Sequence, residues 1–129
     1  MNTDERRTEL DQLTERAIGC AFEVSNTLGC GFLEKLYENA LAVELRRTGL
    51  RIDQQRPIRV RYKGELVGDY VLDLLVEGVV VVEVKAADAL DEAHTAQCPN
   101  YLKATGCPVC LLFNFGKPRV QHRRFVRDF

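Results

Sequence analysis

The segment YVLDLLVEGVVVVEVKA, at residues 70–86, constrains the fold of this chain more than any other part of the sequence. It consists of two aliphatic runs joined by a Glu-Gly pair, which is typical of two core β-strands and the turn between them. Asp73 interrupts the first run, and Glu83 and Lys85 close the second. An isolated charge is strongly unfavourable in a low-dielectric interior unless it is paired or binds a metal. We therefore expect a charged site at the edge of a small sheet, where two carboxylates share a divalent cation.

The length and the charge of the chain narrow its fold and its partners. A chain of 129 residues is predicted to form one domain, residues 1–129, with one core. The formal net charge of −1 gives no general attraction to nucleic acid, so such a contact must rest on local charge. Residues 117–127 carry five cations and no acid. We interpret this segment either as a solvated edge strand or as a strip that contacts phosphates, with Arg123 and Arg124 as candidate substrate contacts.

The N-terminal segment MNTDERRTELDQ lacks the apolar region of a signal peptide. Elsewhere, no apolar stretch approaches the ~18 residues that a membrane helix needs. These patterns predict a cytoplasmic protein without membrane association, in which the five cysteines are reduced. An odd number of cysteines also argues against a complete disulfide framework.

Cys107 and Cys110 form a CxxC pair, which is a common element of iron–sulfur and zinc sites. Such sites need about four ligands, whereas Cys20, Cys30 and Cys98 are scattered along the chain. A spacing of three predicts that Cys107 and Cys110 point to opposite faces of a strand. We interpret both as small buried apolar side chains.

Hydrophobic periodicity predicts an α/β chain with the element order ααβββαββ. The predicted elements are a helix from Leu10 to about Gly29, a helix over Leu33–Arg47, strands at Ile58–Tyr62, around Asp73 and over Val79–Val84, a helix over Ala89–Lys103, and strands at Val109–Phe115 and Arg119–Val126. The four consecutive valines leave no polar face, so their strand is expected to be central and covered on both sides. Pro99 lies inside the third helix and predicts either a kink or a restart with Pro99 in the first turn.

The register of the two strands in residues 70–86 decides whether the three ionic residues form one site. Glu83 and Lys85 are two residues apart, so they point to the same side of a strand. A tight two-residue turn at Glu77-Gly78 would place Asp73 opposite Val82 and on the wrong side. A three-residue turn or a β-bulge would place Asp73 opposite Glu83. A functional site therefore predicts the longer turn or a bulge.

Two carboxylates that converge on one point repel each other unless a cation lies between them. Oxygen ligands of this kind suit Mg²⁺ or Mn²⁺. The ammonium group of Lys85 is then expected to orient a water molecule or to neutralise charge that develops on a phosphate.

At this point the residues resemble a known family. The pattern Asp73…Glu83-x-Lys85 resembles the PD-(D/E)XK nuclease superfamily, and the segment from Gly31 to Tyr37, GFLEKLY, resembles the signature of its GxxExxY proteins. The spacing of Gln97 and Tyr101 is similar to the Q-x-x-x-Y helix of RecB-type nucleases. The resemblance extends from about Ile18 to Phe115, which is most of the chain.

The resemblance implies a restriction-endonuclease-like α/β core, in which a mixed β-sheet is flanked by helices. It implies that Asp73 and Glu83 are metal ligands and that Lys85 is the catalytic lysine. Glu34 corresponds to an additional acid close to the metal, delivered from a helix. Its alternative role is a carboxylate that is favoured in a first helical turn by the helix dipole.

The same resemblance implies that Gln97 and Tyr101 line the site and contact substrate. Pro99 lies between them and departs from the usual pattern. Tyr37 is interpreted as a core residue or as a further substrate contact. His94 lies on the helix face of Gln97, and we interpret it as a surface or supporting residue, not as a metal ligand.

These observations favour a Mg²⁺- or Mn²⁺-dependent phosphodiesterase acting on nucleic acid, with DNA as the expected substrate. Because a chain this small offers little surface for base readout, any specificity is expected to come from a homodimer or a partner protein. Two alternatives stay open: a non-catalytic nucleic-acid- or protein-binding module that keeps the nuclease fold, and a component of a toxin–antitoxin or defence system.

Overall fold

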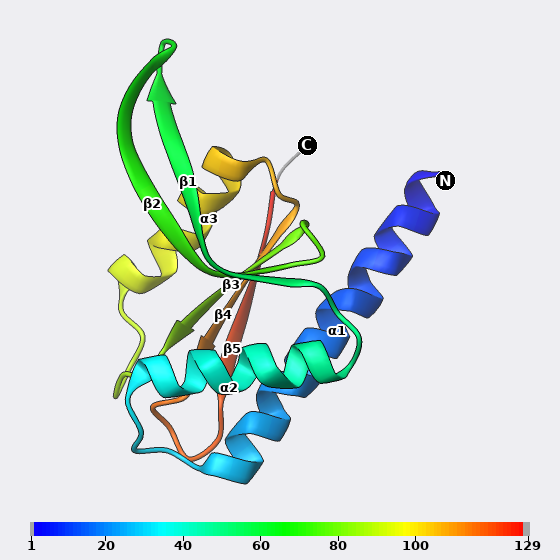
Figure 1. Cartoon of the computed structure of the whole chain (residues 1–129), viewed down its shortest axis with the longest axis vertical. Coiled ribbons are helices and arrows are strands. Elements are labelled where there is room, and N and C mark those ends of the chain that lie inside the picture. Colours follow the sequence, from blue (N-terminus) through cyan, green and yellow to red (C-terminus); the bar gives the residue numbers. More distant parts are fainter. Residues whose placement is uncertain (1, 128–129) are drawn as a thin grey trace.

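The computed structural model describes residues 2–127, in which a five-stranded mixed sheet has helices on both faces (Figure 1). The elements follow the predicted order: α1 (Thr3–Leu28), α2 (Glu34–Arg47), β1 (Ile52–Tyr62), β2 (Glu65–Val76), β3 (Val80–Lys85), α3 (Glu92–Thr105), β4 (Val109–Asn114) and β5 (Gln121–Val126). The strands lie side by side in the order β1-β2-β3-β4-β5. The pair β3–β4 is parallel, and the other three pairs are antiparallel. A parallel pair needs a crossover connection, and α3 provides it by connecting the end of β3 to the start of β4.

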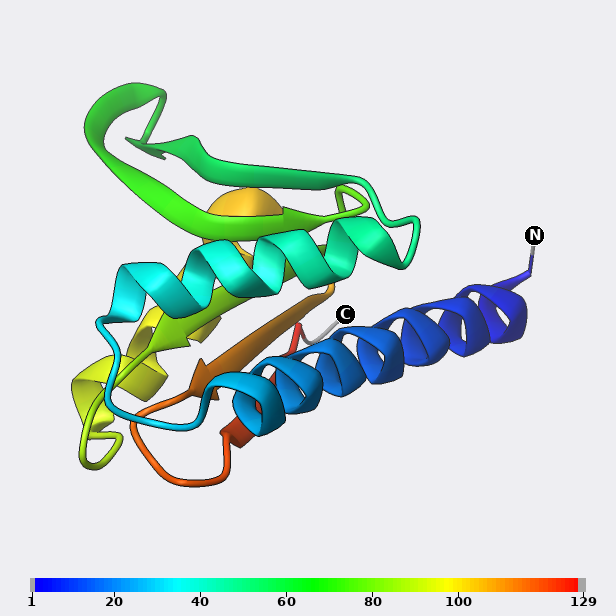
Figure 2. The same cartoon turned by 60° about the horizontal axis from the view of Figure 1, so that its bottom comes forward.

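Helices α1 and α2 cover one face of the sheet (Figure 2). Helix α1 begins at Thr3, earlier than the expected Leu10, because the side chain of Asn2 caps it by accepting from the Glu5 amide at 2.8 Å. Its buried positions recur at steps of three and four and include Ala17, Cys20 and Val24.

Helix α3 covers the other face of the sheet. Its buried residues Cys98, Tyr101 and Leu102 pack on Leu72, Val81, Cys110 and Leu112 of the strands. The helix runs through Pro99 from Glu92 to Thr105, so of the two alternatives, a kink or a restart, the restart is wrong. Pro99 is exposed, on the side of the helix away from the sheet. No helix in residues 2–127 is both long enough and apolar enough to span a bilayer.

The turn between β2 and β3 has three residues and confirms the longer of the two predicted turns. Val76 pairs with Val80, so Glu77, Gly78 and Val79 form the loop. Glu77 and Gly78 adopt positive φ angles of 52° and 71°, as in a type I′ turn, and the Val79 amide donates to the Val76 carbonyl at 3.0 Å. Val79 is the additional residue of the loop. Because Val79 is in the loop, β3 begins at Val80, one residue later than expected.

Strands β1 and β2 form a hairpin that extends past the rest of the sheet (Figure 1). They pair from Ile52 to Tyr62, except at Gln55 and with a register shift between Val60 and Arg61, whereas β2 pairs with β3 over Leu74–Val76. The hairpin therefore leaves the sheet at about the position of Asp73. Its first strand is longer than the expected Ile58–Tyr62 because it starts at Ile52.

Candidate active site

Asp73 and Glu83 face each other across β2 and β3. Leu74 pairs with Val82, and the next residue on each strand brings Asp73 opposite Glu83. The backbone amide of Asp73 donates to Glu83 Oε1 at 3.2 Å, and the amide of Val84 donates to Asp73 Oδ2 at 2.8 Å. The two carboxylates therefore replace ladder hydrogen bonds at the point where the strands separate. The three-residue turn produces the arrangement that a functional site requires.

The surroundings of both carboxyl groups favour their neutral forms. Glu83 is only 3% exposed, and this burial, together with the nearby charge of Asp73, raises its pKa to about 9. Asp73 is half-buried, and burial also raises its pKa, against the opposing hydrogen bond from the Val84 amide. A buried acid and a half-buried acid at one point create a strong demand for positive charge.

Lys85 supplies part of that charge. It lies two residues after Glu83 on the same face of β3, and its ammonium group favours the ionised forms of both Asp73 and Glu83. The three residues that the sequence singled out therefore share one site.

The segment after Lys85 is fixed by Asn114, a residue that sequence reasoning missed. Asn114 is fully buried. Its side chain accepts from the Ala87 amide at 2.9 Å and donates to the Ala87 carbonyl at 3.0 Å. It also accepts from Gly116 N at 3.0 Å. The end of β4 thus holds the chain in place directly after the lysine.

Glu38 of α2 is a second residue that sequence reasoning missed. Its side chain is 4% exposed and raises the pKa of Asp73 more strongly than Glu34 does. It accepts hydrogen bonds from Gln54 at 2.6 Å, from Gln55 at 3.0 Å and from Lys35 at 2.9 Å. Its position on the apolar face of α2, three residues before Leu41, was a signal available in the sequence.

The contacts of Glu38 also shape the strand beside Asp73. Gln55 has a φ angle of 55°, an uncommon conformation for a residue other than glycine. The ladder between β1 and β2 is interrupted at the position where Gln55 would face Asp73. The Glu38 carboxylate therefore stabilises the irregularity at which Asp73 enters the site.

Gln97 and Tyr101 lie one helical turn apart on α3. Tyr101 is buried, and burial together with the charges of Glu83 and Asp73 raises the pKa of its hydroxyl. The buried Oε1 atom of Gln97 has no hydrogen-bond partner among the described residues. A buried acceptor of this kind is rare unless a ligand or a water completes it.

Tyr37 is a core residue in the structure, not a substrate contact. It is fully buried and stacks on Phe115 with the ring centroids 4.9 Å apart. Its hydroxyl donates to the Gly29 carbonyl at 2.6 Å and accepts from Phe32 N at 3.2 Å. Both hydrogen bonds of the hydroxyl are thus made within the loop that precedes α2. The interpretation of Tyr37 as a core residue therefore holds, and its interpretation as a substrate contact does not.

Glu34 begins α2 and is exposed. Its charge acts on Asp73, but less than those of Glu38 and Lys85 do. Within residues 2–127, no three histidine, cysteine, aspartate or glutamate side chains gather closely enough to hold a metal by themselves. The predicted ligand set of Asp73, Glu83 and Glu34 is therefore brought together only as the pair Asp73 and Glu83.

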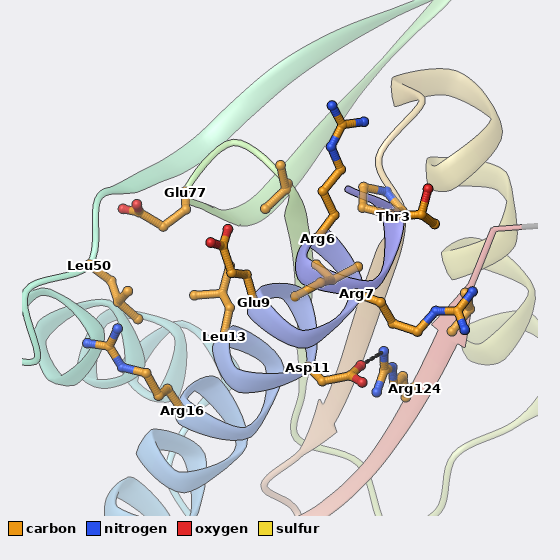
Figure 3. A pocket seen from close by; sticks show the side chains of 14 residues that line it. Thr3, Arg6, Arg7, Glu9, Asp11, Leu13, Arg16, Leu50, Glu77 and Arg124 are labelled. Carbon is orange, nitrogen blue, oxygen red and sulfur yellow. Dashed lines mark hydrogen bonds and ion pairs between the residues drawn. The ribbon is translucent and has the colours of Figure 1, made fainter. Parts of the chain in front are cut away.

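Arg123 and Arg124 are separated by the sheet. Arg123 pairs with Leu112 in the ladder and shares the α3 face with Glu83, two strands away. Arg124 points to the α1 face and forms an ion pair with Asp11 at 2.8 Å (Figure 3). Of the two interpretations of residues 117–127, a single phosphate strip would need both arginines on one face, whereas adjacent residues of a strand point to opposite faces.

Arg124 also lines a cavity of about 770 Å³ between the first turns of α1, the β2–β3 turn and β5 (Figure 3). The cavity walls include Leu10, Leu13 and Val79, and arginines stand at its rim. It adjoins the start of β3, whereas Glu83 and Lys85 are at the end of that strand. The cavity is therefore separate from the charged site, which is defined by Asp73, Glu83 and Lys85.

The contacts of Cys107, Cys110 and His94 are those of structural residues. Cys107 and Cys110 are both buried in the cluster below α3, so the expectation of opposite faces is wrong, because Cys107 precedes the strand. A hydrogen bond with Cys98, and then burial, raise the pKa of Cys110. His94 caps α3: its amide donates to Asp91 at 2.8 Å and its ring accepts from the Asp91 amide at 3.3 Å.

The pair Asp73 and Glu83 fits a hard divalent cation. Mg²⁺ does not need an all-protein cage, since one or two carboxylates commonly hold it while waters and substrate phosphates complete the octahedron. Burial raises the pKa of both acids, so a cation bound between them would favour their ionised forms. Carboxylate oxygens are also the ligand type that such cations prefer.

Comparisons with known proteins agree with this geometry. The family model described as the PD-(D/E)XK nuclease superfamily matches residues 11–125. A search of curated proteins finds no match. Among solved structures, the chain is similar to an alkaline exonuclease, LHK-Exo, from Laribacter hongkongensis, with a TM-score of 0.52 and 16% identity.

That similarity covers 73% of this chain and 56% of the exonuclease chain, so this chain spans a little over half the length of that protein. At such low identity the similarity concerns the fold alone, and it confirms the restriction-endonuclease-like architecture expected from the sequence. The family model covers most of the chain. The chain therefore belongs to the PD-(D/E)XK nuclease superfamily.

Proposed function

We propose that this chain is a metal-dependent nuclease that hydrolyses the phosphodiester backbone of DNA. The observation that carries the proposal is the placement of Asp73 opposite Glu83 at the end of β3, with Lys85 on the same face. A family whose members are nucleases supplies the reaction class. We propose Mg²⁺ as the cation and Mn²⁺ as its substitute.

Asp73 and Glu83 are the proposed metal ligands, and a divalent cation bound there polarises the scissile phosphate and lowers the pKa of a bound water. The two amide donations, from Asp73 to Glu83 and from Val84 to Asp73, fix the orientation of both carboxylates. Lys85 is the proposed catalytic lysine. Its ammonium group orients the attacking water or neutralises charge on the phosphate, and the contacts of Asn114 keep its backbone in place.

The substrate contacts are proposed on the α3 face. Tyr101 keeps its hydroxyl proton because its pKa is raised, so it can donate to a phosphate oxygen. The unpaired Oε1 of Gln97 can accept from Lys85 or from a water. Arg123 shares this face and is the proposed outer phosphate contact. Glu34 is a proposed outer acid, which adds to the negative potential at Asp73.

We also propose that the chain is a GxxExxY protein. In support, each of the three motif residues has a distinct structural role. Gly31 adopts a φ angle of 113°, which glycine accepts readily. Tyr37 ties the same loop together through Gly29 and Phe32. Glu34 is thereby presented in the first turn of α2, on the side of Asp73.

A cleavage assay tests the proposal. Supercoiled plasmid, linear duplex, single-stranded DNA and RNA are incubated with the protein in Mg²⁺, in Mn²⁺ and in EDTA. We expect metal-dependent cleavage of DNA that falls at least about 100-fold in Lys85→Ala and Asp73→Asn. A wild type that cleaves none of these substrates better than both variants would leave the non-catalytic binding module as the function. Calorimetry with Mn²⁺ distinguishes loss of metal binding in Asp73→Asn from loss of catalysis in Lys85→Ala.

A further inference from the structure

The outer part of the β1–β2 hairpin presents an uncovered face with two tyrosines. Ile58 pairs with Tyr70 and Val60 with Gly68, and alternation places Tyr62 on the same face as Ile58 and Val60. Tyr62 is 63% exposed and Tyr70 is 49% exposed. The sequence pattern Ile58, Val60, Tyr62 is that of a half-buried strand, yet its outer end lies beyond β3 and α3 (Figures 1 and 2).

This tyrosine face leads to the acids. Tyr70 contacts Tyr101 edge to face, with ring centroids 5.6 Å apart, and the pKa of Tyr101 responds to the charges of Glu83 and Asp73. Ile58 and Leu72 pack in the same cluster as Tyr101. A chain that lies along the hairpin would therefore run from Tyr62 past Tyr70 and Tyr101 to the carboxylates.

The spacing of the two rings excludes stacking on neighbouring bases of a duplex. Tyr62 lies four residues beyond Ile58, the ladder partner of Tyr70, which is about 13 Å along a strand. Between them the rung Val60–Gly68 carries a glycine, and a Cβ added there would meet no atom within 4 Å in the described chain. Bases can stack on separated aromatic rings when the strand is single and its bases are unstacked.

Local charge favours the same occupant. Residues 56–72 contain four cations, Arg56, Arg59, Arg61 and Lys63, and two acids, Glu65 and Asp69, in a chain of net charge −1. Arg59 and Arg61 alternate with Ile58, Val60 and Tyr62, so they point to the opposite face of the hairpin. Lys63 lies over the ring of Tyr62 at 5.3 Å, so a cation stands beside the outer ring. A basic strand with interleaved aromatic rings is the composition that single-stranded nucleic acid recognises.

We propose that the β1–β2 hairpin is a stacking platform that guides single-stranded DNA to the active site, with Tyr62 and Tyr70 contacting bases. The inference rests on the proposed nuclease function and specifies its substrate as a single strand, or the single-stranded end of a duplex.

Binding is measured apart from cleavage, by fluorescence anisotropy in EDTA with a labelled oligonucleotide of about 12 nucleotides and with the matching duplex. The wild type is expected to bind the single strand more tightly. Tyr62→Ala is expected to weaken single-strand binding about 5- to 100-fold, since each stacked base depends on its ring. Gly68→Leu, which fills the space between the rings and removes no contact, is expected to weaken it as well.

Two variants are matched controls. Tyr62→Phe keeps the ring and is expected to bind as the wild type does. Val71→Ala alters the opposite face of the same hairpin and is expected to leave binding unchanged. Circular dichroism verifies that each variant is folded.

Equal affinity of the wild type for single strand and duplex, or no binding of either, overturns the inference. Unchanged binding by Tyr62→Ala and Gly68→Leu overturns it too. A dimer in solution that Tyr62→Ala dissociates would assign the hairpin to a second copy of the chain instead. Hairpin-dependent binding by a protein that cleaves no DNA with any metal would refute the nuclease and leave the platform standing.

Discussion

At the scale of single residues, Glu83 makes the stability of the protein depend on pH and on metal. With its pKa raised from 4.5 to about 9 in the folded state, Glu83 keeps its proton between these values while the unfolded chain releases it. The folded state then binds more protons, so its free energy of unfolding falls as pH rises, by about 1.4 kcal/mol per pH unit. The stability that this proton provides is complete below about pH 4.5 and is lost as pH rises toward 9.

We therefore expect wild-type protein in EDTA to lose stability between pH 6 and pH 8.5, as measured by urea denaturation. Glu83→Gln, which cannot ionise, is expected to be more stable than the wild type at pH 8 and to show a shallower pH dependence. Mg²⁺ is expected to stabilise the wild type at pH 8 and to have little effect on the variant. Parallel pH profiles for the two proteins in EDTA would contradict the buried, neutral state of Glu83.

Glu38 is a second residue whose role can be measured. Glu38→Gln replaces one acceptor oxygen by a donor that faces the side-chain amides of Gln54 and Gln55. The expected loss is about 1–3 kcal/mol in the free energy of unfolding, because the buried amide group introduced at position 38 would face other donors. Glu15→Gln, on the exposed face of α1, is the control and should stay within about 0.5 kcal/mol of the wild type. An equal loss of unfolding free energy in Glu38→Gln and Glu15→Gln would show that the contacts of Glu38 beside Asp73 do not stabilise the protein.

The sequence could predict a site residue where its type is unusual for the surrounding segment, but not where its role depends on contacts between distant residues. Asp73, Glu83 and Lys85 stand out because charge in an aliphatic strand is costly. Glu38 is also buried, and its spacing from Leu41 places it on the apolar face of α2, but that spacing does not show what the acid contacts. Its partners Gln54 and Gln55 are distant in sequence, so only the folded chain shows that they meet.

At the scale of elements, the register of β2 and β3 could be predicted from the requirement that Asp73 and Glu83 form one site. The course of α3 at Pro99 and the length of the β1–β2 hairpin could not be predicted. The three-residue loop at Glu77–Val79 follows from the need to bring Asp73 and Glu83 together. At Pro99 either a kink or a restart was expected, and α3 continues through it from Glu92 to Thr105. The length of the hairpin depends on pairing between distant residues such as Ile52 and Val76, which no local pattern contains.

The loop that follows Lys85 supports a prediction of its own. A Cβ at Gly116 would meet the backbone of Ala87, with Ala87 N at 2.5 Å, and Ala87 lies two residues after the lysine. Gly116→Ala is expected to cost about 1–3 kcal/mol of stability through overpacking and to lower kcat by displacing Lys85. The measurements are urea denaturation and steady-state cleavage of DNA.

Gly19→Ala is the control for that substitution. Gly19 lies within α1, and a Cβ there would meet no atom within 4 Å in the described residues. Alanine is favoured over glycine in a helix interior by about 0.5–1 kcal/mol, so this variant should gain stability and keep its kcat. Normal activity and stability in Gly116→Ala would show that the close approach to Ala87 is not needed to position Lys85.

At the scale of the whole molecule, the sheet divides the basic residues between a face that includes the acids and a face that does not. Arg124 pairs with Asp11 on the α1 face, and Arg119 lies over the ring of Phe22 at 5.4 Å. A run of cations in sequence, residues 117–127, is thus not a patch in space. In the hairpin, Arg59 and Arg61 also point away from the tyrosine face, whereas Lys63 lies over the ring of Tyr62 at 5.3 Å.

This division predicts which cations set the salt dependence of DNA binding. For a single strand, the slope of log K against log salt is about −0.7 for each phosphate neutralised. Lys63→Ala is expected to make the slope shallower by about 0.7 if its ammonium group meets one phosphate. Arg124→Ala should leave the slope unchanged, because its guanidinium is paired on the far face of the sheet. Anisotropy titrations between 50 and 200 mM salt in EDTA measure both slopes. A shallower slope in Arg124→Ala with none in the hairpin variant would move the path of the nucleic acid to the α1 face and away from Asp73, Glu83 and Lys85.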